Sequence, residues 1–178
     1  ERDLPVKFEI GDLAGEFGNG WTEVGRNVLG ELGTQILLKD TIAGRAERAA
    51  AGWDGDQYVV FEGPDGQLAS LLVSTWDTEK DAEEFLAGYA RDLAARFGGD
   101  PAIDENKIAW NTQSGRIHLV RNGLDVHAVV GAPADAVDGL LHNLSHTERT
   151  EIEGGLPDVS PIERTAPWET NAPDTPIE

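Results

Sequence analysis

The sequence predicts an α+β fold: an antiparallel sheet of about five strands with helices packed on one face, preceded by a helical segment and followed by a Pro-rich tail. Two observations favour this fold. After residue 52 the apolar spacing changes from helical to strand-like, and the segments follow the order β-β-α-β-β-β-α. Short turn sequences join neighbouring strands, as they do in antiparallel pairs. We therefore divide the chain into a loop and helical segment (1–52), an α+β domain (53–150) and a tail or linker (151–178).

The first 52 residues are predicted to form a short strand, a loop and two helices. Residues 6–10 alternate weakly and favour a strand, and the glycine-rich residues 11–20 favour a loop. Apolar residues at three- and four-residue spacing predict a helix over 23–42. A second helix is expected over 45–51, ending at Gly52.

The centre of the chain predicts a hairpin followed by a long helix. Residues 57–62 and 67–75 are expected to pair as strands, because Gly63-Pro64-Asp65-Gly66 between them has the chemistry of a turn. Thr78 and Asp81 form a variant of the capping box and predict the start of a helix. The helix is expected to bury one apolar stripe and to end at Gly98, and the stripe consists of Ala82, Phe85, Leu86, Tyr89, Leu93 and Phe97.

Three further strands are predicted over 107–111, 115–121 and 124–130. Asn122-Gly123 predicts a two-residue type I′ turn between the last two of them. Pro133 then opens a final helix, and the repeated prolines after residue 151 predict an extended tail. No Gly-x-Gly-x-x-Gly motif follows a strand, so the sequence does not predict a dinucleotide-binding fold.

The net charge of the protein indicates the salt environment that it suits and the classes of partner that it disfavours. Asp and Glu number 33 against 14 Lys and Arg, giving a formal charge of −19 over 178 residues. Such a charge repels itself in dilute buffer, but the Debye length falls to about 3 Å in about 1 M salt, so we expect a halophilic protein. The acidic surface argues against nucleic acid and anionic membranes as partners. No run of about 18 apolar residues is present, so no membrane span is expected in this chain.

Two histidines on the last predicted hairpin are candidate metal ligands. With Asn122-Gly123 as the turn, His118 faces His127 across the two strands, on the side away from the core. Directly opposed residues have Cβ atoms about 5 Å apart, which lets two imidazoles share a divalent metal. We therefore assign His118 and His127 as the candidate metal site, with Asp125 as a nearby third group. The alternative is a half-exposed pair that binds nothing.

Two other patterns resemble metal sites but depart from the known motifs. His142 and His146 lie four residues apart on a predicted helix, as in zinc metalloproteases, but Asn143 stands where those enzymes need Glu. A polar helix face is therefore favoured. Asp54-Gly55-Asp56 resembles the start of a calcium loop, but Tyr58 occupies the third ligand position, so a turn before a strand is favoured. No cofactor is predicted apart from the divalent metal considered above.

The sequence offers no nucleophile for covalent catalysis. It contains no cysteine and no Gly-x-Ser-x-Gly motif, so we assign no catalytic residue. Aromatic residues gather around the first hairpin and its helix, where core packing is the favoured role. A carbohydrate or peptide groove lined by Trp53 and Trp76 is the alternative.

Several motifs give the chain a family resemblance over about residues 4–145. They are Gly30-Glu31-Leu32-Gly33, Gly52-Trp53-Asp54-Gly55-Asp56-Gln57-Tyr58, Trp76-Asp77-Thr78-Glu79-Lys80-Asp81-Ala82-Glu83-Glu84-Phe85, and Arg121-Asn122-Gly123 with Val129-Val130-Gly131-Ala132-Pro133. Together they resemble the C-terminal part of a family of haloarchaeal surface proteins and lipoproteins. In that family an upstream helical region is similar to a zinc metallopeptidase. The metal-binding helix of a zincin has no counterpart in this chain, so the resemblance transfers no catalytic residue.

The sequence therefore favours a non-catalytic structural or interaction domain at the extracellular surface of a halophilic archaeon. The alternative is the scaffolding or substrate-binding C-terminal part of a secreted metallohydrolase whose catalytic helix lies outside this chain. Val28, Leu32 and Ile36 form an apolar strip larger than the small predicted sheet can cover. We expect a partner over this strip, either the N-terminal region of the same protein or another surface protein.

Overall fold

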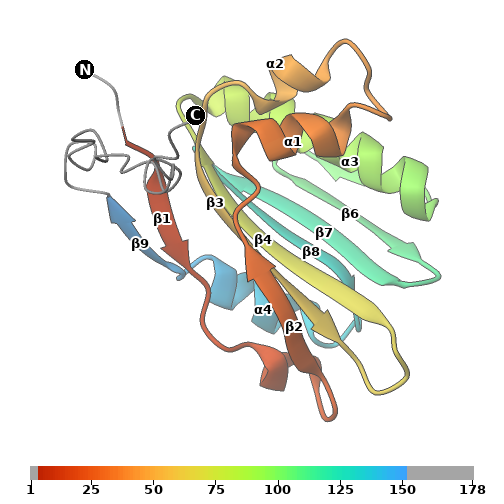
Figure 1. The fold of residues 1–178 in the computed structure, drawn as a ribbon. Coiled ribbons are helices and arrows are strands. Elements are labelled where there is room, and N and C mark those ends of the chain that lie inside the picture. Colours follow the sequence, from red (N-terminus) through yellow and green to blue (C-terminus); the bar gives the residue numbers. More distant parts are fainter. Residues whose placement is uncertain (1–3, 152–178) are drawn as a thin grey trace, which may run out of the picture.

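The computed structural model describes residues 4–151, and a seven-stranded antiparallel sheet is its centre (Figure 1). The strand order is β2-β3-β4-β8-β7-β6-β5. The strands are β2 (Thr22–Asn27), β3 (Trp53–Glu62), β4 (Leu68–Trp76), β5 (Ala102–Asp104), β6 (Lys107–Thr112), β7 (Gly115–Asn122) and β8 (Asp125–Ala132). A separate two-stranded sheet pairs β1 (Val6–Glu9) with β9 (Glu148–Glu151).

Both faces of the large sheet are covered. Helices α1 (Gly30–Leu38), α2 (Ala46–Ala50) and α3 (Glu79–Phe97) pack on one face. The other face carries β1, β9, the short 3₁₀ helix η1 (Ala14–Phe17) and helix α4 (Val137–Leu144). Figure 1 shows these two groups on opposite sides of the strands.

The predicted fold class is therefore wrong in two respects. The sheet has seven strands rather than about five, and helices do not cover one face alone. The extra strand β2 occupies the start of the predicted helix over 23–42, because pairing of residues 22–27 with β3 overrides the helical spacing that begins at Val24. The extra strand β5 lies in an expected loop and pairs with β6.

Each face has its own core. The face under α3 buries Leu72, Trp76, Leu119 and Val126 against helix residues, including Phe85 and Leu93. On the opposite face Val59, Phe61, Leu71 and Val73 pack against residues from η1, β1 and α4, including Phe8, Phe17 and Leu140. Burial on both faces explains why residues 58–61 of β3, and most positions of β4 and β8, are apolar in succession rather than at alternate positions.

Helix α3 begins and ends where the sequence predicts. The backbone N–H of Asp81 donates to Thr78 Oγ1 at 3.2 Å, so Thr78 is the N-cap. Gly98 has a positive φ of 68° and its N–H donates to the carbonyl of Ala94, which ends the helix. Residues 152–178 of the predicted tail lie outside the described residues, and Glu151 ends β9.

Candidate functional site

The motif over residues 52–58 contains a buried carboxylate, that of Asp56. Asp56 accepts hydrogen bonds from the backbone N–H groups of Leu29 and Gly30, both at 2.8 Å, and from Trp53 Nε1 at 2.7 Å. Burial raises the pKa of Asp56, while these three hydrogen bonds favour its charged form. Asp56 therefore fixes the N-terminus of α1 to β3, which is a structural role rather than that of a calcium ligand.

The residues on either side of Asp56 hold β1 across the sheet. Gln57 Oε1 accepts a hydrogen bond from the backbone N–H of Ile10 at 2.6 Å. Gly55 lies directly against the carbonyl oxygen of Val6, where any Cβ would collide with it. This close approach requires glycine, so the motif is explained by packing of β1 on β3.

The two candidate metal ligands share a sheet face but do not oppose each other. Asn122 pairs with Asp125, so the loop consists of Gly123 and Leu124 rather than Asn122 and Gly123. His118 consequently pairs with Val129, and His127 with Val120. The predicted direct pairing is wrong, and the two imidazoles are diagonal neighbours, for which the spacing is about 7–8 Å.

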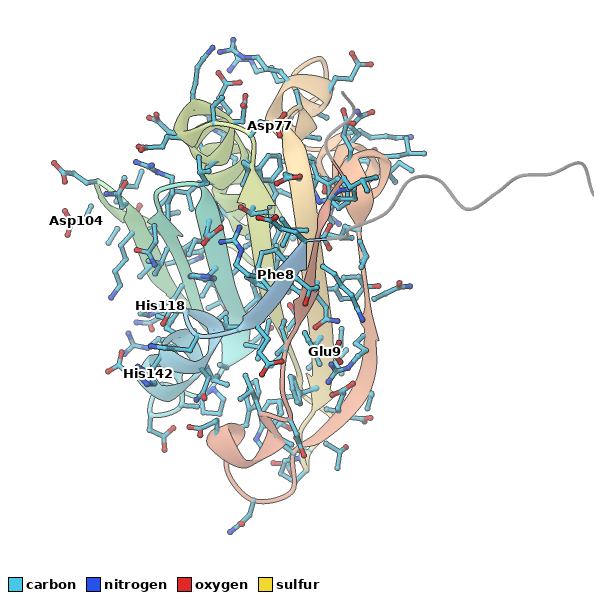
Figure 2. The ribbon with its side chains drawn as sticks, turned by 90° about the vertical axis from the view of Figure 1, so that its left-hand side faces the viewer. Phe8, Glu9, Asp77, Asp104, His118 and His142 are labelled. Carbon is cyan, nitrogen blue, oxygen red and sulfur yellow. The ribbon has the colours of Figure 1, made fainter. Side chains whose placement is uncertain are left out.

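Both histidines are buried rather than half-exposed. His118 is 9% exposed and His127 is 5% exposed. Figure 2 views the sheet face that β1 and β9 cross, with His118 on the sheet and His142 on α4. Within residues 4–151, neither ring nitrogen of His118 has a hydrogen-bond partner. In this range no group of three or more His, Asp or Glu residues is arranged to hold a metal ion.

Burial lowers the pKa of both imidazoles. For His118 the largest cause is desolvation, followed by the nearby cations Lys107 and Arg116, and Asp138 acts in the opposite direction. Desolvation also dominates for His127, and Asp125 opposes it. Because protonation would place positive charge in the core, the folded state favours neutral rings at both positions.

His142 on α4 and His146, two residues after the helix ends, belong to a polar surface, as the sequence favours. The rings of His142 and His146 lie 4.5 Å apart between centroids, and His146 Nδ1 lies 2.8 Å from the carbonyl oxygen of His142. Since a carbonyl only accepts, that nitrogen carries the proton. Leu140 and Leu144 are buried on the other side of the helix.

The expected alternative of a groove lined by Trp53 and Trp76 does not form. Trp76 is 1% exposed, stacks on Phe85 at 4.6 Å between ring centroids, and donates from Nε1 to Ser74 Oγ. Trp53 donates to Asp56 as described above. The favoured prediction of core packing is therefore correct for this pair.

A groove of about 670 Å³ lies instead where α3 ends before the sheet does. Its floor is a row of paired residues on four adjacent strands: Val60, Ser70, Val130 and Ile117. Phe97, the last residue of α3, stands at its side. In Figure 1 the strands β3, β4, β7 and β8 extend beyond the end of α3.

Two turns complete the walls of this groove. Gly66 and Gln67 come from the link between β3 and β4, and Leu68 begins β4. Thr112 ends β6, and Gln113 and Ser114 link it to β7. Gly131 also lines the groove, and a Cβ there would lie 2.5 Å from the carbonyl oxygen of Leu68. Glycine at this position therefore lets β8 approach β4 closely at the groove floor.

The lining of the groove contains no charged side chain. Its residues are Val60, Gly66, Gln67, Leu68, Ala69, Ser70, Phe97, Thr112, Gln113, Ser114, Ile117, Val130 and Gly131. By contrast, charged residues make up 26% of the whole sequence. We call this feature the uncharged groove. No single sequence motif identifies the uncharged groove, because its residues are brought together by the pairing register of the strands and by the point at which α3 ends.

Comparison with known proteins places the chain in one family. Residues 17–141 match the family described as "Domain of unknown function (DUF8575)", and the chain belongs to this family. The match spans the seven-stranded sheet, helices α1 to α3 and all the residues that line the uncharged groove. No curated protein and no solved structure matches the chain. Across residues 4–151, every helix is too short or too polar to cross a bilayer.

Proposed function

We propose that this chain is a non-catalytic binding domain of a salt-adapted surface protein, and that the uncharged groove holds a neutral ligand with apolar groups. The observation that carries the proposal is the absence of charge from the groove lining in a chain with a net charge of −19. The expected setting, the extracellular surface of a halophilic archaeon, is supported by that same acidic composition.

Concentrated salt favours this kind of recognition. Coulombic attraction is screened within about 3 Å at about 1 M salt, so a charged ligand gains little from an ion pair there. Burial of apolar surface is not screened, and excluded salts strengthen it. An uncharged groove floored by Val60, Val130 and Ile117 therefore binds in brine through contacts that salt does not weaken.

The chemistry of the lining defines the ligand class. The floor is apolar apart from the hydroxyl group of Ser70, and Gln113 and Ser114 add amide and hydroxyl groups in the wall. A volume of about 670 Å³ lies within the range of small-molecule sites. The groove thus fits a neutral molecule, or a neutral segment of a chain, with an apolar body and a few hydrogen-bonding groups.

The groove also lacks groups for acid–base or nucleophilic chemistry. None of its lining residues is Asp, Glu, His, Lys or Tyr, and Ser70 has no imidazole beside it in the lining. The buried His118 and His127 face the opposite core. The lining therefore supports binding rather than proton transfer.

A direct test fills the groove. Ser70 lies half-buried on the floor, so Ser70→Phe should occupy the space without removing a core contact. We expect a neutral naphthylamine dye to bind the wild-type chain at one saturable site in molar KCl, and Ser70→Phe to abolish this binding. Ile103→Ser, at an apolar residue on β5 that is 75% exposed, is the matched control and should bind normally. Equal binding by wild type and Ser70→Phe would refute the groove as the site.

A further inference from the structure

An apolar strip on the outside of α1 is exposed to solvent. Val28 is 50% exposed, Leu32 is 68% exposed and Ile36 is 58% exposed. Their four-residue spacing places Leu32 and Ile36 on one side of the helix, and Val28 lies two residues before the helix begins. Leu32 and Ile36 also line a hollow of about 290 Å³ between α1 and the start of α2.

Unpaired cations lie beside this strip. Among residues 4–151, five Lys and Arg side chains have no carboxylate within 4.0 Å: Lys39, Arg45, Arg91, Lys107 and Arg116. Lys39 lines the same hollow as Leu32 and Ile36, together with Glu47. Arg45 and Arg91 line a second hollow of about 230 Å³ between α2 and α3, together with the ion-paired Arg48 and Glu84. The linings of the two hollows thus hold four cations and two carboxylates.

The two hollows lie on either side of one connection of the chain. The connection from α1 to α2 separates them, contributing Lys39 and Gly44 to the first hollow and Ile42 and Arg45 to the second. Helix α2 lies tightly on α3 beneath the second hollow, where a Cβ on Gly88 would lie 3.2 Å from Ala49 Cβ. Val28, Leu32, Ile36, Lys39, Arg45 and Arg91 define what we call the α1–α3 face.

We propose that the α1–α3 face docks an acidic amphipathic polypeptide segment, a helix that presents aliphatic side chains on one side and carboxylates beside them. Charge complementarity favours this partner. Seven other cations among residues 4–151 are already paired with carboxylates of this chain, whereas Lys39, Arg45 and Arg91 remain available next to exposed aliphatic residues. Apolar anchors with flanking charges are the usual basis of helix recognition by a groove.

Other partner classes fit this face less well. A nucleic acid or an anionic bilayer carries many charges and would meet the repulsion of a chain with a net charge of −19. A basic partner would be drawn to the acidic surface as a whole and would have no reason to select the three free cations. A short acidic segment needs only the contacts on this face, and concentrated salt screens the remaining repulsion.

The test measures fluorescence anisotropy of a labelled peptide with glutamate and leucine at helical spacing, titrated with the full chain in molar KCl. We expect saturable binding. Leu32→Ser with Ile36→Ser should weaken it by about tenfold or more. Arg45→Ser with Arg91→Ser should weaken it by a smaller factor, because exposed ion pairs contribute little in molar salt. The matched controls are Ile103→Ser for exposed apolar area and Lys107→Ser with Arg116→Ser for unpaired cations. These controls should leave the affinity unchanged.

Peptide variants and other polyanions test the partner class. Replacing glutamate by glutamine in the peptide should lower affinity, and replacing leucine by serine should abolish binding. Failure of the original peptide to bind, or an equal loss in the control variants, would overturn the proposal. Preferential binding of phosphatidylglycerol vesicles or duplex DNA would overturn it as well. Six of the seven substituted side chains are exposed and Arg116 is half-buried, so a thermal melt of each variant verifies that it is folded.

Discussion

The indole of Trp53 donates a 2.7 Å hydrogen bond to Asp56, and that same carboxylate receives the first two N–H groups at the start of α1. These contacts join the start of β3 to a helix more than twenty residues earlier in the chain. Because the N-terminal N–H groups of a helix lack partners within it, a buried carboxylate is an effective cap.

Asp56→Asn should therefore destabilise the protein. The asparagine amide has one accepting oxygen in place of two, so at least one of the three N–H donors loses its partner. We expect a loss of about 1–3 kcal/mol in the free energy of unfolding. Chemical denaturation measures it, and hydrogen exchange should increase first in α1. Asp65→Asn, at an exposed turn residue, is the control; equal stability of the two variants would contradict the role assigned to Asp56.

The buried histidines predict loss of stability in mild acid. The pKa of His118 and of His127 is lowered on folding, so between the folded and unfolded values the unfolded chain binds more protons. Their stabilising effect is therefore complete above the ordinary pKa of about 6.5 and declines as the pH falls below it. Asp138 and Asp125 reduce this effect, while Lys107 and Arg116 increase it for His118.

His118→Leu should reduce this pH dependence. Both ring nitrogens of His118 lack partners among the described residues, so leucine removes two unsatisfied polar atoms and should leave stability at pH 7 equal or higher. Urea melts between pH 5 and pH 7.5 measure the slope. Leu124→Ser, at an exposed position whose side chain does not titrate, is the control and should keep the wild-type slope. If the slope of stability against pH is unchanged in His118→Leu, His118 binds no additional proton when the protein unfolds.

The acidic surface predicts that salt stabilises the fold. A net charge of −19 opposes the compact state, and screening relieves this repulsion. Raising KCl from low to molar concentration should increase Tm by at least about 3 °C, which corresponds to about 1 kcal/mol in a domain of this size. Calorimetry over a KCl series measures this shift. A Tm that is constant or falls with KCl would contradict salt adaptation.

Local signals in the sequence located several elements correctly. The Thr78 cap and Gly98 bound α3, and the Gly63–Gly66 turn joins β3 to β4 as predicted. The exposure of Leu32 and Ile36 also follows from the excess of apolar residues on α1. These features depend on neighbouring residues, so a single sequence contains the information that determines them.

Features that depend on register or on distant pairing were not predictable in the same way. Asn122-Gly123 has the composition of a type I′ turn, but Gly123 takes the first loop position with a φ of 62°, which moves His118 away from His127. The spacing of Val24 and Val28 is helical, although β2 pairs with β3. The uncharged groove combines residues of four strands with the end of α3, so it is defined only after the sheet has formed.

Wild type and Ser70→Phe can be titrated with a neutral apolar dye in low and in molar KCl to measure ligand binding in the uncharged groove. We expect one site whose affinity is maintained or rises in molar KCl and which disappears in Ser70→Phe. Affinity that falls steeply with KCl, or that survives Ser70→Phe, would contradict this expectation.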